Sequence, residues 1–248
     1  ISYVFDEINE SPKNNLEGGN IYSRGQWAAS LRYHDGLFYV FFGTGNKSYI
    51  YTAKDPAGKW EQKLVIDEYL HDASMLFDDD GKIYLAYGAR HIRIIEFYDD
   101  LSGINPNGLN VEVIPAEPKG LLEGVHFYKY GKQYYMTFIW WPEGGIQICF
   151  RSDKVAGPYE MKVILSDDMG YANHGVAQGC FIDTEEGDWY AMLFQDHEAV
   201  GRVPVLMPCR WVDGWPMLGD ENGKVPPVME KPIKGYEGKT ELVVSDDF

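Results

Sequence analysis

The sequence predicts an all-β fold, a β-propeller, from three observations. Aromatic residues make up 15% of the 248 residues, and 27 glycines and 13 prolines supply frequent turns, a composition typical of strands joined by tight connections. Aromatic-rich runs are joined by short turns that contain glycine. This unit of strand, turn and strand recurs four times, with its turn glycines 45, 50 and 56 residues apart. Such a period is typical of propeller blades.

The first repeat shows the pattern most clearly. Residues 26–33 and 37–42 are aromatic-rich runs joined by His34-Asp35-Gly36, and glycine accepts the positive φ that such a turn requires. A third strand is expected over residues 49–53. The later repeats span residues 73–97, 125–159 and 179–215, with turn glycines Gly81, Gly131 and Gly187. A β-sandwich with evenly spaced hairpins is the alternative, but four units in one order favour the propeller.

The two ends of the chain do not complete a further repeat. Ile1-Ser-Tyr-Val-Phe5 resembles the last strand of another blade, and residues 242–245 supply at most one strand more. Every blade of a closed ring is flanked on both sides, because an open edge or apolar face is a liability. We therefore expect a first blade that is incomplete in this chain, with the propeller over residues 1–240. Residues 241–248 are expected to begin a linker or a following module.

Charge and cysteine content exclude several function classes. The formal net charge is −16, which repels nucleic acid and anionic membrane surfaces, so a small neutral ligand is expected. The sequence contains no apolar run of the roughly 18 to 20 residues that spans a bilayer and opens with no signal-peptide pattern. A soluble protein is expected, in the cytoplasm, in the periplasm or secreted; oligomeric state is left open. Cys149, Cys180 and Cys209 are far apart and predict buried free thiols.

Polar and aromatic residues precede or open the predicted inner strand of each repeat, namely Trp27, Asp72, Glu123 and His174. Inner strands surround the central channel of a propeller, so these side chains should converge at one end of it. Asp72 alone is typical of a turn residue, but it precedes an inner strand rather than a hairpin. Glu123 lies among apolar residues, and Gly124 beside it would allow a ligand to approach the backbone closely.

The histidines and tryptophans each have two interpretations. His71, His126 and His174 are either core residues or metal ligands, and because no HxH or HExxH spacing occurs we do not expect zinc. Trp140 and Trp141 are either core residues or a sugar-stacking wall. We expect the second, in a loop beyond a strand end.

Five motifs of this chain occur together in one known family. They are Trp27-Ala-Ala-Ser30, His71-Asp72-Ala-Ser74, Leu122-Glu123-Gly-Val-His126, Asn173-His174-Gly175, and Val200-Gly-Arg202 followed by Trp211-Val-Asp-Gly-Trp-Pro216. In this combination the chain resembles glycoside hydrolase family 43 over nearly its whole length. The resemblance implies a five-bladed β-propeller, β-xylosidase or α-L-arabinofuranosidase activity, and inversion at the anomeric carbon. Residues 245–248 resemble the start of the β-sandwich module that follows the propeller in many members.

The resemblance also implies roles for individual residues. Glu123 matches the general acid, and Asp72 matches the aspartate that tunes and orients this acid. His174 and Arg202 match residues that contact the sugar, and Trp27 matches an aromatic of the pocket wall. Trp140 and His126 complete the expected substrate-binding residues. No cofactor is expected to be required, although some relatives hold calcium near the histidine that matches His174.

Acid catalysis places a demand on Glu123. A glutamic acid has an ordinary pKa of about 4.3, so an acid that keeps its proton near pH 6 to 7 needs a pKa raised by about two units. Burial beside Leu121 and Leu122 and the charge of Asp72 both act in that direction.

The family's general base belongs to an Ala-Asp-Pro type motif on the first blade, which is absent from this sequence. We therefore expect the base upstream of Ile1. The predicted function is an exo-acting glycosidase on xylo-oligosaccharides or on arabinose side chains of xylan, with β-xylosidase favoured. The alternatives are a carbohydrate-binding propeller without catalysis and an inactive fragment.

Overall fold

The computed structural model describes residues 3–4, 11–21, 25–115, 120–142, 144–171 and 173–232. The strands in these residues form four antiparallel sheets, each of four strands in sequential order. Two short 3₁₀ helices, η1 (Pro12–Asn15) and η2 (Glu198–Val200), are the helical elements of the described part. The predicted propeller repeats are therefore confirmed as four blades.

Each blade is a meander in which every strand pairs with the next. Blade 1 contains β1 (Ser30–His34), β2 (Leu37–Thr44), β3 (Lys47–Ala53) and β4 (Glu61–Ile66). Blade 2 contains β5 (Ser74–Phe77), β6 (Ile83–Tyr87), β7 (Ile92–Phe97) and β8 (Asn110–Ile114). Blade 3 contains β9 (Leu121–Tyr130), β10 (Gln133–Trp141), β11 (Ile146–Ser152) and β12 (Glu160–Leu165). Blade 4 contains β13 (Ala177–Asp183), β14 (Trp189–Asp196), β15 (Arg202–Val212) and β16 (Trp215–Leu218).

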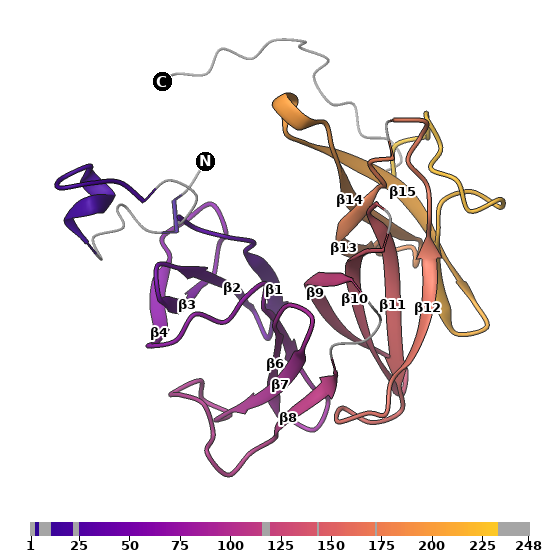
Figure 1. Cartoon of the computed structure of the whole chain (residues 1–248). Coiled ribbons are helices and arrows are strands. Elements are labelled where there is room, and N and C mark those ends of the chain that lie inside the picture. Colours follow the sequence, from indigo (N-terminus) through magenta and orange to yellow (C-terminus); the bar gives the residue numbers. More distant parts are fainter. Residues whose placement is uncertain are drawn as a thin grey trace.

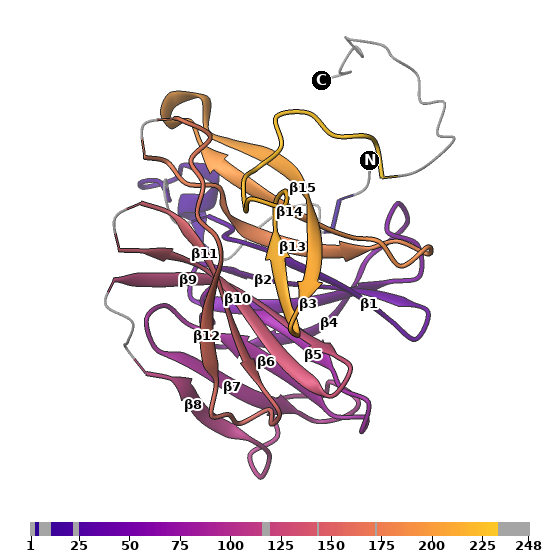
Figure 2. The same ribbon diagram turned by 90° about the vertical axis from the view of Figure 1, so that its right-hand side faces the viewer.

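The predicted turn glycines lie where the repeat analysis placed them. Gly36, Gly81, Gly131 and Gly187 each have a positive φ and each lie between the first and second strands of a blade. The first strands of successive blades are neighbours, with β1 beside β5, β5 beside β9, and β9 beside β13. Figure 1 shows the blades following one another around the molecule, and Figure 2 shows the same order from the side.

Apolar side chains from both faces of the middle blades form the core between neighbouring blades. In β6, Leu85 packs in the cluster shared with blade 1, whereas Tyr84 packs in the cluster shared with blade 3. Successive side chains of a strand point to opposite faces, so alternate residues of one strand serve two interfaces. This explains why β6 is continuously apolar and why both β6 and β7 are almost entirely buried.

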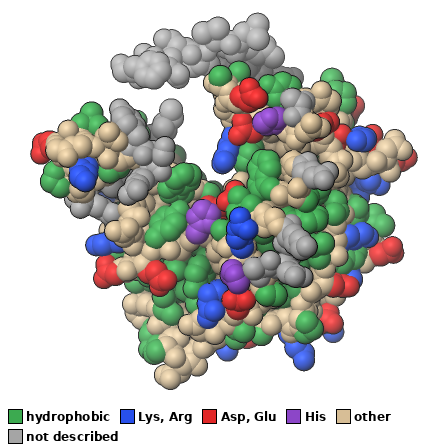
Figure 3. All heavy atoms as spheres, viewed as in Figure 1, with side chains coloured by type: hydrophobic (Ala, Val, Ile, Leu, Met, Phe, Trp, Pro, Cys, Tyr) green, Lys and Arg blue, Asp and Glu red, His purple; other side chains and the backbone are tan. Residues whose placement is uncertain are grey.

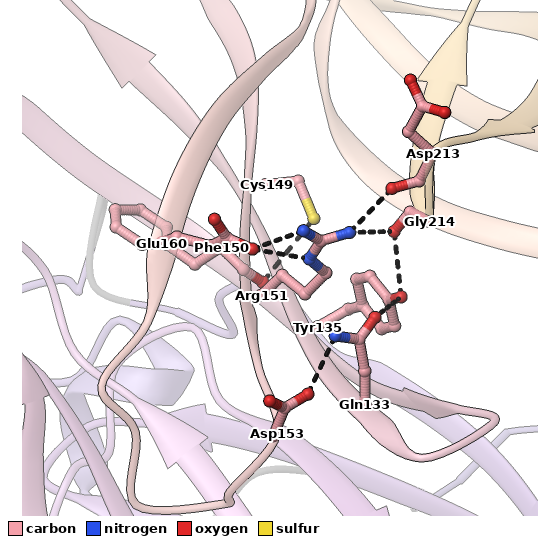
Figure 4. Close-up of polar contacts among 9 residues, drawn as sticks. All are labelled: Gln133, Tyr135, Cys149, Phe150, Arg151, Asp153, Glu160, Asp213 and Gly214. Atoms are coloured by element: carbon pink, nitrogen blue, oxygen red, sulfur yellow. Dashed lines mark hydrogen bonds and ion pairs between the residues drawn. The ribbon is translucent and has the colours of Figure 1, made fainter.

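A polar anchor joins blade 3 to blade 4 (Figure 4). Arg151 of β11 donates from Nη1 to the carbonyl oxygens of Asp213 and Gly214, at 2.9 and 3.1 Å. Its guanidinium lies 4.2 Å from the centre of the Trp215 ring, and the Tyr135 hydroxyl donates to the Gly214 carbonyl at 3.0 Å. Gly214 has a φ of 73° and a Cβ there would lie 2.7 Å from Arg151 Nη1, so this turn requires glycine.

Several sequence predictions concern the ends and the cysteines. Within residues 1–5, only Tyr3 and Val4 are described and neither is in a strand; residues 242–245 and the predicted boundary at 240 lie outside the described residues. The three cysteines are free, as predicted, with Cys149 and Cys209 buried and Cys180 partly buried. In the described part of the chain, no helix has the length and apolar character needed to cross a membrane.

Candidate active site

The predicted site residues gather at one end of the propeller. Asp72 lies two residues before the first strand of blade 2, and Glu123 lies near the start of the first strand of blade 3. His174 precedes the first strand of blade 4, and Arg202 begins the third strand of that blade, which runs parallel to the first. Strand starts that point the same way share one end of the ring, so these residues approach each other. Histidine, acidic and basic side chains lie close together near the hollow seen in Figure 3.

A β-bulge sets the direction of the Glu123 side chain. In the pairing of β9 with β10, Gly124 and Val125 together lie opposite Phe138, so β9 holds one extra residue there. Glu123 and His126 therefore project from the same side of the strand although they are three residues apart. Gly124 has a φ of 71°, the conformation that glycine supplies in many bulges. The Glu123 side chain remains 24% exposed, open to a ligand.

Asp72 is attached to the backbone beside Glu123. Its Oδ2 accepts a hydrogen bond from the Gly124 N–H at 3.0 Å, and its side chain is only 7% exposed. Burial raises the pKa of Asp72, as does the nearby charge of Glu123, while His71, the Gly124 N–H and Arg202 oppose the rise. The hydrogen bond joins blade 2 to blade 3 next to the predicted acid.

His71 contacts both carboxylates. Its Nε2 lies 3.4 Å from Asp72 Oδ2 and 3.6 Å from Glu123 Oε2. The interaction with Glu123 raises the pKa of His71, with burial opposing and the charge of Asp72 assisting. The two predicted carboxylates and this imidazole therefore form one connected cluster.

His174 and Arg202 approach from blade 4. The His174 carbonyl accepts from Gln195 Nε2 at 2.7 Å, which holds the backbone while the side chain stays 30% exposed. Arg202 places its guanidinium carbon 4.5 Å from the centre of the Phe194 ring, and its charge is close enough to lower the pKa of Asp72. The structure thus brings a cation and a histidine to the same end as the carboxylates.

The two predicted aromatic walls differ in placement. Trp27 is 47% exposed, ahead of β1, and its backbone N–H donates to the Gly43 carbonyl at 3.2 Å. Trp140 and Trp141 are the last residues of β10 rather than part of a loop, so the predicted loop placement is wrong. Because the chain keeps pairing with both neighbouring strands as far as Trp140, this side chain packs against the core between blades 2 and 3. Its role in sugar binding stays a prediction.

His126 lies deeper along the axis than Glu123. Burial and the charge of Arg32 lower the pKa of His126 to about 3, so the ring is neutral at ordinary pH. Its Nδ1 is buried without a hydrogen-bond partner among the described residues, and the ring stacks 6.2 Å from Tyr128. Contact between His126 and a substrate stays a prediction.

Comparison with known proteins agrees with this geometry. The sequence profile of glycosyl hydrolases family 43 matches residues 4–216. The chain belongs to this family.

The relatives that this family 43 chain resembles include proteins named as xylosidases and proteins named as arabinofuranosidases. It is 33% identical to a putative beta-xylosidase of Xylanibacter ruminicola, covering 94% of this chain and 46% of the relative. It is 32% identical to a non-reducing end alpha-L-arabinofuranosidase of Bacteroides ovatus, covering 96% and 48%. A solved structure of a bifunctional GH43-CE protein of Bacteroides eggerthii is 38% identical, with a TM-score of 0.83 over 92% of this chain and 30% of that one. The chain spans about half the length of these curated relatives.

Sequence reasoning on this family 43 chain missed Tyr69 and the bridging position of His71. The Tyr69 hydroxyl lies 3.3 Å from His71 Nδ1, while Leu70 between them is buried, with 1% exposure. The polar–apolar–polar alternation of residues 69–71 was the available signal, since alternate residues of an extended segment share a side. Contact with Glu123, 52 residues further along the chain, has no such local signal.

The candidate positions for a metal ion are the cluster of His71, Asp72 and Glu123 and the side chain of His174. Among the described residues, His71, Asp72 and Glu123 have potential ligand atoms within 4.8 Å of one another. We interpret the group as two carboxylates around one imidazole, because His71 Nε2 lies 3.4 Å from Asp72 Oδ2 and 3.6 Å from Glu123 Oε2. Calcium takes six to eight oxygen ligands, and the carboxylate found beside His174 in the described part is the exposed Glu198, at 3.9 Å. Calcium near His174, held through water, stays a prediction, and no step is assigned to calcium.

Proposed function

We propose that this family 43 protein is an inverting exo-glycosidase acting on xylo-oligosaccharides or on arabinose side chains of xylan, with β-xylosidase activity favoured. The observation that carries the proposal is the partly exposed Glu123 side chain beside the buried Asp72, whose pKa the charge of Arg202 lowers. The names of the relatives support a glycosidase acting on xylose or arabinose linkages.

In the proposed mechanism, Glu123 protonates the glycosidic oxygen as the bond to the anomeric carbon breaks. General acid catalysis of this kind contributes roughly 10²- to 10⁴-fold to rate. Asp72 orients the acid, because its bond to the Gly124 N–H fixes the backbone on which Glu123 stands. Arg202 and His174 donate to sugar hydroxyls, and Trp27 packs against a sugar ring.

Inversion also needs a carboxylate base about 6.5 to 9.5 Å from the acid to activate water. We assign no described residue to this role and place the base on the family's first blade, a fifth blade that precedes blade 1 of the described part, as the family resemblance implies. Exposed apolar side chains on blade 1 and blade 4 support such a blade, since they resemble faces that a neighbour would cover. These are Leu31 and Tyr33 of β1, Ile182 of β13 and Met192 of β14.

Hydrolysis of xylobiose and of a 4-nitrophenyl α-L-arabinofuranoside by the full-length protein tests the proposal. Glu123→Gln should lower kcat at least 100-fold on xylobiose, whose sugar leaving group requires protonation. The matched control is Glu61→Gln, at an exposed position of β4, which should keep normal activity. Normal turnover by Glu123→Gln would exclude this residue as the acid.

Two further measurements separate the remaining alternatives. Proton NMR of the first product should show the α-anomer from a β-xyloside, and the β-anomer would exclude inversion. Calorimetry with xylose and arabinose, if it showed binding without any turnover, would instead favour a non-catalytic carbohydrate-binding propeller.

A further inference from the structure

We infer that Tyr69 and His71 form a positioning pair that holds one oxygen of Glu123 and leaves the other free to protonate the leaving group. This inference rests on the proposed role of Glu123. It adds two residues to the acid machinery and assigns a defined hydrogen-bond direction to each.

The position of His71 carries the first step. Its Nε2 faces Glu123 Oε2 at 3.6 Å and Asp72 Oδ2 at 3.4 Å, and it is buried without a hydrogen-bond partner among the described residues. In the inferred pair, an N–H at this nitrogen donates to Oε2 of the acid when the 3.6 Å separation shortens to hydrogen-bond length. The proton of a neutral Glu123 then resides on Oε1, the oxygen that remains available for the glycosidic oxygen.

The Tyr69 hydroxyl determines which nitrogen of His71 holds the proton. It lies 3.3 Å from Nδ1, and burial, aided by the charge of Asp72, raises the pKa of Tyr69 to about 12. The hydroxyl therefore keeps its proton and donates it to the Nδ1 lone pair. A neutral imidazole that accepts at Nδ1 has its hydrogen on Nε2, the nitrogen facing both carboxylates. The other tautomer would direct a lone pair toward two carboxylates.

Blade 1 is shaped to hold this pair. A Cβ on Gly43 of β2 would lie 2.6 Å from Tyr69 Cε2 and 2.9 Å from Cδ2, so the tyrosine ring fits only against glycine. The carbonyl of Gly43 also accepts a hydrogen bond from the backbone N–H of Trp27. One backbone position therefore supports both the proposed positioning pair and the proposed aromatic wall of the pocket. The charged and titratable groups around His71 are Tyr69, Asp72 and Glu123, with Arg202 acting through Asp72.

Leaving-group dependence provides the main test in the full-length protein. A sugar leaving group requires protonation by the acid, whereas 2,4-dinitrophenolate departs without it. Tyr69→Phe should lower kcat on xylobiose about tenfold, the equivalent of one hydrogen bond of about 1.4 kcal/mol. Its KM and its kcat on the dinitrophenyl glycoside should stay within about twofold of the wild-type values. The matched control is Tyr51→Phe, which removes a hydroxyl bonded to Gln62 on blade 1 and should leave all these constants unchanged.

A double-mutant cycle isolates the tautomer argument. His71→Gln retains an N–H donor near the Nε2 position but has no tautomer to select. It should therefore keep more activity on xylobiose than His71→Leu, and Tyr69→Phe should cost nothing further in the His71→Gln background. An equal loss on both classes of leaving group, or an undiminished cost of Tyr69→Phe in that background, would overturn the inference.

Nitrogen NMR tests the pair without any substrate. At a pH above the raised pKa of His71, where the imidazole is neutral, its ¹⁵N shifts, assigned by comparison with His71→Gln, should show the Nε2–H tautomer in the wild type and a mixed population in Tyr69→Phe. A wild-type Nδ1–H tautomer would refute the inference, whatever the activity. Absence of hydrolysis by the wild type would refute the proposed function instead, so the two failures are distinguishable.

Discussion

Replacing Gly124 by alanine probes the backbone beside the proposed acid. Gly124 has a φ of 71°, and a Cβ there would lie 2.6 Å from both Cγ and Cδ of Gln178 and 2.7 Å from its Nε2. The substitution thus imposes two separate costs. One is the left-handed backbone conformation of a residue with a Cβ, and the other is a collision with a side chain that is 9% exposed.

The two costs have different sizes. A left-handed conformation costs a non-glycine residue about 1–2 kcal/mol, and overpacking a buried site costs about 1–3 kcal/mol. Together they predict a loss of about 2–5 kcal/mol in the free energy of unfolding. For a domain of this size, each kcal/mol lowers Tm by about 2–4 °C, so Gly124→Ala should melt about 4–20 °C below the wild type. Activity should fall as well, because the Gly124 N–H holds Asp72.

Gly131→Ala is the matched control for the conformational cost. Gly131 has a φ of 60° and nothing within 4 Å of the position of a Cβ, so this variant should lose only about 1–2 kcal/mol. Adding Gln178→Ala to Gly124→Ala should recover the packing part of the loss. Urea unfolding measures all four proteins, with kcat measured in parallel. If Gly124→Ala were no less stable than Gly131→Ala, the collision with Gln178 would be refuted.

Three further predictions concern the blade anchor, the buried aspartate and the thiols. Arg151→Ala removes the hydrogen bonds to two carbonyl groups, the ion pair with the exposed Glu160 and a cation–π contact and should cost about 2–3 kcal/mol in urea unfolding; a change under about 0.5 kcal/mol would contradict the anchor. Burial raises the pKa of Asp72 above the value of about 3.9 in an unfolded chain, so the folded protein binds this proton more tightly than the unfolded chain does. The free energy of unfolding therefore falls as the pH rises from about 3.9 through the raised pKa of Asp72. Asp72→Asn should therefore melt above the wild type at pH 7 and level with it at pH 3, and a lower melting temperature at pH 7 would contradict this. Burial raises the pKa of the Cys149 and Cys209 thiols, so a thiol reagent should label at most Cys180 in the native protein and all three after denaturation; fast native labelling of a second thiol would contradict their burial.

The blades were predictable because their signals are local. An aromatic run, a turn with glycine and a second run specify a hairpin without reference to the rest of the chain, and Gly36 or Gly81 could be recognised from its immediate neighbours. Convergence of Asp72 and Glu123 followed from repetition, since equivalent positions of successive blades meet at one end of a ring. The loop expected at Trp140 failed for a related reason. Pro142 and the glycines after it signal a turn, but the position at which strand pairing stops depends on the neighbouring strands.

The bulge and the bridging imidazole could not be read from the sequence. A glycine within a strand pattern suggests a bulge, yet only the pairing with Phe138 shows that Gly124 and Val125 share one partner. This shift by one residue determines whether Glu123 and His126 face the same side. Contacts across 52 residues, such as His71 with Glu123, depend on how blades 2 and 3 pack. Local periodicity contains no information about that packing.

The acid site and the interface between blades 2 and 3 are therefore physically the same region. Asp72 lies just before the first strand of blade 2. The Gly124 N–H that donates to it and the Glu123 carboxylate that it is proposed to orient both belong to blade 3. Directly beneath, the Ser74 hydroxyl accepts from the Phe127 N–H at 3.0 Å, and Arg32 of blade 1 donates to both Ser74 and the Phe127 carbonyl. Three blades thus fix the segment that follows Glu123. Loosening these contacts should displace the acid before the blades separate, so we expect activity to be lost at lower denaturant concentrations than secondary structure.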